Sequence, residues 1–234
     1  MASHPKPKLD FTIRKLPGFN DVPETTIDAL TKVNCAVFHN DRFNRLVLGG
    51  HWDLAPAWHR SFVIDCLMGG VVYVVELDNQ IIGDALWHGP GQALSQVEGA
   101  AEAGWDRYMA ALKKKEPGME EWWSSYFLPK HSEFMNECLQ DPAYKLNGWF
   151  LQVIGVLPEY QRNGIGSALI NVIFNEIARN PDAPPAERNI CLEVEAEGAR
   201  NFYKKLGFVE KGEIAVKGLG DLGCCPISCF AKEF

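Results

Sequence analysis

The stretch Gln161-Arg162-Asn163-Gly164-Ile165-Gly166 joins an apolar run that predicts a strand to a segment with helical periodicity. Its two glycines allow the backbone to approach an anion closely. The first N–H groups of the helix predicted from Ile165 lack intrahelical acceptors and carry the positive end of the helix dipole. Arg162 adds a formal positive charge. The turn is therefore predicted to bind a phosphate or pyrophosphate, with a tight turn that binds nothing as the alternative.

Two other phosphate-binding motifs do not fit this turn. A P-loop requires Gly-Lys-Ser/Thr, whereas Gly166 is followed by Ser167-Ala168. A dinucleotide-binding turn requires a further glycine three positions on, and that position is Leu169. The pattern is thus neither of these.

Strands and helices are predicted on both sides of the turn. The C-terminal part predicts a strand over 149–156, a helix over about 165–180, a strand over 190–194, a short helix over 199–206 that ends at Gly207, and strands over 208–216 and 226–230. The N-terminal part predicts a strand over 11–16, a helix from Pro23 to about Asn40, a second helix over 42–48, and a hairpin of 71–75 with 81–87.

Residues from about 92 to 140 are rich in aromatic side chains at helical spacing. The segment is interpreted as a helical insertion whose apolar stripes pack on the sheet, or in part as a wall of a substrate pocket. A chain of 234 residues is long for one minimal domain and short for two. We therefore expect one domain over 1–234 with an insertion at about 92–140.

Charge and hydropathy limit the classes of partner that the sequence is expected to bind. The formal net charge is −7, which argues against broad nucleic-acid binding. The N-terminus has no apolar segment of a secretory signal, and the longest apolar stretch, 67–75, is too short to span a bilayer. We expect a cytoplasmic protein without membrane or nucleic-acid partners.

Cysteines are not expected to bind metal. The seven cysteines are scattered, and the cluster of Cys224, Cys225 and Cys229 has no C-x-x-C pair and no nearby histidine. No metal site is predicted. Cys191 lies in an apolar strand without a histidine partner, so covalent catalysis is not expected.

The pattern Gln161-x-x-Gly164-x-Gly166 resembles the Q/R-x-x-G-x-G/A motif of the GNAT N-acetyltransferases. The resemblance continues upstream through Trp149-Phe150-Leu151 and Gly155-Val156-x-Pro158, and downstream through 202–208, Phe-Tyr-Lys-Lys-Leu-Gly-Phe. Within this family, the sequence of these segments is similar to that of the puromycin N-acetyltransferase-like branch and its fungal relatives, and so is the sequence of 36–43. The resemblance to the family covers residues 148–210 and, more weakly, residues 11–90.

The resemblance implies an α/β (α+β) GNAT fold: a mixed, largely antiparallel central sheet with flanking helices, in which the strands 149–156 and 190–194 splay apart. It implies acetyl-CoA as co-substrate, with Tyr203 protonating the departing thiolate. At Ala196 many relatives have an asparagine that contacts the CoA arm. Backbone groups of Ile154 and Val156 would pair with the pantetheine arm, and the pyrophosphate would be held by Gln161, Arg162, Asn163, Gly164, Ile165, Gly166 and Ser167.

The general base has several candidates. Glu193 and Glu195 share one face of a predicted strand, and each can accept a proton or simply be solvated or salt-bridged. Asp84 and His88, at the end of another strand, are further candidates. Acceptor binding is expected to combine negative charge with aromatic faces suited to a cationic amine, from Phe38, Asp41, Phe43, Trp58, His88 and Trp122.

The expected function is acetyl-CoA-dependent N-acetylation of a primary amine on a small molecule, by direct attack in a ternary complex without a metal. One alternative keeps the fold but acetylates a peptide or protein amine, or uses a longer acyl chain. Another is a non-catalytic acyl-CoA-binding regulatory module. The protein is expected to be a monomer or a homodimer.

Overall fold

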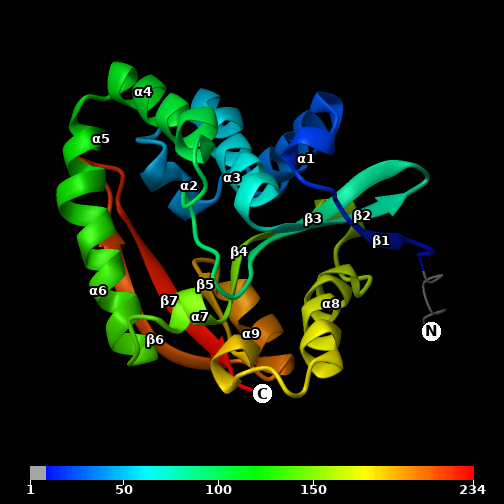
Figure 1. Ribbon diagram of the computed structural model, residues 1–234. Helices are drawn as coiled ribbons and strands as arrows, with labels where there is room; N and C mark the ends of the chain where they lie inside the picture. The colour runs from blue at the N-terminus through cyan, green and yellow to red at the C-terminus, as the bar shows by residue number, and fades with distance from the viewer. Residues whose placement is uncertain (1–8) are drawn as a thin grey trace, which may run out of the picture.

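The computed structural model of the chain describes residues 9–234, and its centre is one seven-stranded sheet (Figure 1). The strand order is β1-β2-β3-β4-β5-β7-β6, and all neighbours are antiparallel except the parallel pair β4 and β5. This confirms the expected mixed, largely antiparallel sheet. The strands are β1 (Thr12–Lys15), β2 (Val71–Leu77), β3 (Gln80–His88), β4 (Trp149–Val156), β5 (Ile190–Val194), β6 (Val209–Lys217) and β7 (Cys224–Lys232).

Helices cover both faces of this sheet. Strand β2 is a continuous apolar run that turns alternate side chains to opposite faces, so Val72 and Val74 join one buried cluster and Val71, Tyr73 and Val75 join another. Among the described residues, no helix is both long and apolar enough to cross a membrane. The helices are α1 (Glu24–Val37), α2 (Arg42–Val47), α3 (Ala55–Gly69), α4 (Asp106–Lys115), α5 (Gly118–Glu121), α6 (Leu128–Leu139), α7 (Tyr144–Asn147), α8 (Ile165–Arg179) and α9 (Glu197–Lys205).

Helix α3 was not predicted from the sequence. It runs for 15 residues and packs against α1 and β3 in the centre of the first cluster. Ten of its residues are buried, and three of these, His59, Ser61 and Asp65, are polar. A helix buried on most sides has no clean division into polar and apolar faces, so the periodicity on which the prediction rests is lost.

The insertion is helical, as expected, and two of its turns are π-helical. These are Ala101–Trp105 and Trp122–Phe127, which lead into α4 and α6 respectively. In Figure 1 the insertion forms an arc of α4, α5 and α6 that passes outside α2 and α3 and reaches the side of β6 and β7. The insertion therefore covers one side of the molecule, outside α2 and α3.

Strands β4 and β5 separate after three paired residues. Their pairing starts at Trp149↔Ile190 and stops at Leu151↔Leu192. At the same level the register between β3 and β4 shifts, because Leu86 faces Val153 while Trp87 faces Leu151. The residue between them, Gln152, is therefore a β-bulge, which bends a strand and ends its regular pairing. The splay expected from the resemblance is confirmed, and the bulge accounts for it.

Asp84 is buried between α1 and the sheet instead of lying in an open site. It accepts a hydrogen bond from Asn34 Nδ2 at 2.7 Å and is fully inaccessible. Its second oxygen has no partner among the described residues. Burial raises the pKa of Asp84 to about 7. This carboxyl fixes α1 on the sheet and is not within reach of a substrate cavity.

We predict that Asp84→Asn stabilises the protein near neutral pH. Because the folded-state pKa is raised from 3.8 to about 7, the favourable contribution of the protonated acid is present below pH 3.8 and is lost as the pH rises through 7. The loss amounts to at most about 4 kcal/mol. Urea unfolding between pH 4 and pH 8 should show this slope in the wild type and a flatter slope in Asp84→Asn. The control, Asp182→Asn at an exposed site, should keep the wild-type slope, and an unchanged slope in Asp84→Asn would contradict the assignment.

Candidate functional site

A cavity of about 1040 Å³ opens where β4 and β5 diverge. Its walls come from the N-terminal helices, the insertion, the two diverging strands, the turn before α8, and α9. The cavity brings together most of the residues expected at the site: Phe38, Asp41, Phe43, Trp58, Ile154, Val156, Gln161, Arg162, Gly164, Ile165, Gly166, Ser167, Glu193, Glu195 and Tyr203.

The turn before α8 is held in shape by its own side chains. Gln161 donates a hydrogen bond from Nε2 to the carbonyl oxygen of Val156 at 3.0 Å. Asn163 donates from Nδ2 to the carbonyl oxygens of Tyr160 and Gln161, at 3.0 and 3.1 Å. Asn163 does not line the cavity, in contrast to the expectation. Its part is to brace the turn.

Gly164 ends this turn in the left-handed region, with φ of 81°, and is the N-cap residue of α8. A side chain is strained at such a φ, which accounts for the glycine. In the described part of the chain, no backbone acceptor pairs with the amides of 165–167, and Arg162 makes no salt bridge. Three amides and one cation thus face one end of the cavity, as an anion-binding site requires.

Glu193 is paired with two basic side chains, one from the insertion and one from α7. Its carboxylate lies 2.7 Å from His131 Nε2, on α6, and 3.3 Å from Lys145 Nζ, on α7. Burial raises the pKa of Glu193, but the nearby His131 and Lys145 outweigh burial and hold it well below its usual range. A carboxylate in this state is a poor proton acceptor. The prediction that Glu193 is a candidate base is therefore not supported by its surroundings.

The pKa of Glu195 is shifted in the opposite direction, although Glu195 lies only two residues further along the chain. Burial is the main cause that raises the pKa of Glu195 to about 8, followed by the negative charges of Glu193 and Asp41. Within the described residues its carboxylate has no salt-bridge partner. Glu195 is therefore the carboxyl of this site whose proton affinity suits a general base.

Tyr203 lies on α9 and reaches the same cavity. Its ring packs against Phe202, Phe208 and Phe230, with ring centroids 5.0, 5.7 and 6.1 Å away. Burial and, second, the charge of Glu195 raise the pKa of Tyr203 well above its usual value. The phenol therefore keeps its proton throughout the neutral range and can act only as a donor. A proton acceptor and a proton donor are both present at one cavity.

The other end of the cavity is acidic and aromatic. Asp41 caps α2 by accepting a hydrogen bond from the amide of Asn44 at 2.8 Å, and burial raises its pKa. Phe43 lies 5.8 Å from Phe127, a residue of the insertion, between ring centroids. Negative charge beside aromatic faces favours a cationic ligand. Further cavity-lining rings are those of Phe38, His59, Trp58, Trp105, Trp123 and Phe150.

Two residues predicted for the acceptor site lie elsewhere. His88 is buried beside Asp65 and Cys66, and burial, with a smaller effect of Lys145, lowers its pKa to about 4. Trp122 points into the core, where its Nε1 donates to the carbonyl oxygen of Lys217 at 2.9 Å. The neighbouring Trp123 lines the cavity instead. In a helical turn adjacent residues point in different directions, so the aromatic stripe alone did not decide between them.

Sequence reasoning also missed two polar residues of the site. His131 and Lys145, the partners of Glu193, both line the cavity. Neither belongs to a motif, and each is far from Glu193 in the sequence. The insertion brings His131 to β5, and α7, which follows the insertion, brings Lys145.

We predict that His131→Leu destabilises the fold, because it leaves Glu193 with Lys145 alone. The expected loss is about 1–3 kcal/mol in the free energy of unfolding at pH 7, measured by urea denaturation. The depressed pKa of Glu193 means that this contribution is present above pH 4.5 and fades as the pH falls toward the folded-state value. The control, Glu133→Leu, changes an exposed position on the same helix. Equal stability of the two variants at pH 7 would refute the role of the contact.

One protein-family model matches part of this chain. Residues 135–210 match the family model described as an acetyltransferase (GNAT) domain. The matched part contains the bulged β4, the glycine turn with α8, β5 and α9. A search of curated protein sequences found no match.

Solved structures share the fold at low sequence identity. The polyamine N-acetyltransferase of Drosophila melanogaster has a TM-score of 0.62 at 14% identity, over 96% of this chain and 100% of that one. An agmatine N-acetyltransferase has a TM-score of 0.59 at 15% identity, over 96% of this chain and 100% of that one. The ribosomal-protein-S18-alanine N-acetyltransferase of Escherichia coli has a TM-score of 0.52 at 15% identity, over 96% of this chain and 94% of that one. Residues 135–210 of the chain therefore match an acetyltransferase (GNAT) domain, and the chain shares its fold with solved N-acetyltransferases.

Proposed function

We propose that this protein transfers the acetyl group of acetyl-CoA to a primary amine of a small cationic molecule, by direct attack in a ternary complex. One observation carries the proposal: the anion-binding turn and the acidic, aromatic pocket line the same cavity, with Glu195 and Tyr203 among the residues that line it. Co-substrate and acceptor can therefore meet beside an acid and a base.

The turn and strand β4 suit the two parts of CoA. The pyrophosphate would lie on the amides of 165–167 next to Arg162. Beyond Gln152, strand β4 has no β5 partner, so its backbone groups near Ile154 and Val156 can pair with the amides of the pantetheine arm on that side, except the Val156 carbonyl, which accepts from Gln161. Ala196 lines the cavity at the end of β5 and offers no side-chain hydrogen bond to that arm.

Transfer requires three events at the thioester. The amine nitrogen attacks the carbonyl carbon as Glu195 accepts the proton of the amine, directly or through a water molecule. A free backbone N–H of the splayed β4 stabilises the oxyanion of the tetrahedral intermediate. The C–S bond then breaks, and Tyr203 gives its hydroxyl proton to the CoA thiolate. A phenol with a raised pKa holds this proton until the thiolate forms.

The insertion favours a small acceptor over a protein. Its residues Trp105, Trp123, Phe127 and His131 line the cavity, where Phe127 packs against Phe43 and Trp123 against Trp58. We infer that the insertion is part of one domain with the rest of the chain. Two proteins with the same fold are named for agmatine and polyamines, and the resemblance to the puromycin N-acetyltransferase-like branch also points to a small acceptor. Asp41 supplies the negative charge that such amines require.

We predict that acetyl-CoA raises the unfolding temperature of the wild type and that Gly166→Asp abolishes the effect. A ligand that binds only the folded state stabilises it by mass action. A side chain at Gly166 approaches Phe202, since its Cβ would lie 3.3 Å from Phe202 Cζ. The matched control is therefore Gly166→Asn, which has the same shape as the aspartate but no charge.

Thermal-shift titration should give a smaller shift for Gly166→Asn and none for Gly166→Asp, because only the aspartate repels the pyrophosphate. No shift in the wild type at millimolar acetyl-CoA would end the proposal. Equal shifts in both variants would mean that the pyrophosphate binds elsewhere.

We predict that kcat/KM rises with pH through an inflection near 8, the pKa to which burial and neighbouring charges raise Glu195. The base must be deprotonated, so activity is low below this pH and reaches a plateau above it. Glu195→Gln should remove the inflection and lower kcat about 10²–10⁴-fold. Release of free thiol in the presence of agmatine, spermidine or a peptide amine gives the rates.

Glu193→Gln is the comparison variant for this profile, since Glu193 is already paired. It should keep a titrating base, shifted to lower pH because one negative charge next to Glu195 is lost. A wild-type profile in Glu195→Gln would exclude that residue as the base. Faster turnover of a peptide amine than of any diamine would favour the protein-acetylating alternative.

A further inference from the structure

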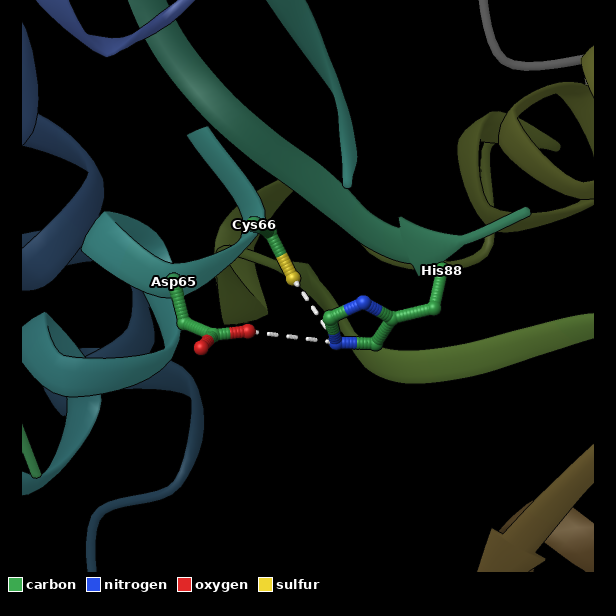
Figure 2. Close-up of side chains that lie close together, drawn as sticks. All are labelled: Asp65, Cys66 and His88. Atoms are coloured by element: carbon green, nitrogen blue, oxygen red, sulfur yellow. Dashed lines mark hydrogen bonds and ion pairs between the residues drawn. The ribbon is translucent and has the colours of Figure 1, made fainter. Parts of the chain in front are cut away.

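Three potential metal ligands meet in the core, outside the cavity. Asp65 and Cys66 lie next to each other on α3, and His88 is the last residue of β3. Figure 2 shows the carboxylate and the thiol turned toward the same ring nitrogen of His88. The Nε2 atom of His88 lies 3.4 Å from Asp65 Oδ2 and 3.6 Å from Cys66 Sγ, and the three ligand atoms lie within 4.8 Å of one another.

The two separations from His88 Nε2 match the edges of a tetrahedral zinc site. Zinc–nitrogen and zinc–oxygen bonds of about 2.0 Å place the two donor atoms about 3.3 Å apart in a tetrahedron, and a zinc–sulfur bond of about 2.3 Å places nitrogen and sulfur about 3.5 Å apart. Imidazole, thiolate and carboxylate are also the ligand types that zinc takes in proteins.

Hydrogen bonding among the three groups does not satisfy them. The exposed fractions of the side chains are 1% for His88 and 6% for Asp65, and Cys66 is fully buried. Asp65 Oδ2 has no hydrogen-bond partner among the described residues, and 3.4 Å is too long for a good one to His88. If Nε2 carries a hydrogen it can serve only one of its two neighbours. If it does not, its lone pair faces the unpartnered oxygen. A cation between the three atoms satisfies all of them at once.

We propose that Asp65, Cys66 and His88 bind one zinc ion. The carboxylate and the thiolate together balance the two positive charges of the ion, so the buried site is neutral, and a water molecule completes the tetrahedron. The thiol proton is released to solvent when the ion binds. The backbone amide of Ser95 donates to Asp65 Oδ1 at 2.7 Å and holds the carboxylate in the orientation that the site needs.

The ion would connect α3 to the end of β3 directly behind the cavity. His88 pairs in register with Phe150 of β4, and Ser95 follows Leu94, and both Phe150 and Leu94 line the cavity. None of the three ligands lines the cavity itself. The site therefore lies apart from the cavity, and it is independent of the proposed acetyl transfer. The cysteine cluster at 224–229 forms no such group among the described residues.

Metal content and ligand identity test the proposal directly. The untagged protein is purified without chelators and its zinc is measured by mass spectrometry. Zinc X-ray absorption then gives the ligand set without any substitution. We expect stoichiometric zinc with one sulfur, one imidazole and only oxygen otherwise. Protein free of zinc that also fails to take up added zinc would overturn the proposal, as would two or more sulfur ligands.

Variants test which residues hold the ion. Cys66→Ser and His88→Gln should bind added zinc more than about tenfold more weakly, since even an outer-shell change has an effect of this size. Cys35→Ser, a half-buried thiol on α1, is the control and should bind as the wild type does. Cobalt added to the metal-free protein should give an intense tetrahedral spectrum with a thiolate charge-transfer band that Cys66→Ser lacks. A band that survives in folded Cys66→Ser would refute the site.

Discussion

The separation of β4 from β5 after Leu151 is the constraint on which the rest of the site depends. Up to that residue the two strands share a parallel ladder, and the bulge at Gln152 then bends β4 away. Backbone groups that would otherwise pair between strands become available to a ligand, and a cavity forms between the strand ends. The turn at 161–167 and helix α9 border this opening, so the anion site and Tyr203 face the same space.

The carboxylates of Glu193 and Glu195, on the far side of this opening, differ in their electrostatic surroundings. Glu193 and Glu195 are separated by one residue, but among the described residues only Glu193 is paired with basic side chains, His131 of the insertion and Lys145 of α7. Its pKa falls, whereas burial and the surrounding negative charges raise that of Glu195. The contacts of Glu193 thus satisfy one buried carboxylate, while Glu195 keeps a raised pKa. His131 of the insertion and Lys145 of α7 therefore set the charge state of a carboxylate that lines the cavity.

Much of the architecture could be predicted from the sequence, and the errors have definite causes. Strands β4 and β5 were predicted with the bounds that the structure shows, because each is a short apolar run bounded by polar or turn residues. Helix α3 was missed because it is buried on most sides and lacks amphipathic periodicity. His88 was assigned to the acceptor site from its position at a strand end, but the packing of α3 encloses it with Asp65 and Cys66. Metal spacing rules that consider neighbours in sequence do not detect such a group.

The sequence by itself determined the glycine turn, the flanking strand and helix, and the position of the tyrosine on α9. These depend on local chemistry: glycines at fixed offsets, apolar periodicity and a helix start. The tertiary structure alone decided which glutamate keeps its proton affinity, which tryptophan faces the cavity and where the insertion meets β5. Those outcomes depend on contacts between residues distant in the chain, such as His131 with Glu193, 62 positions apart. Burial and charge at a site are sums over such contacts, and no local pattern encodes them.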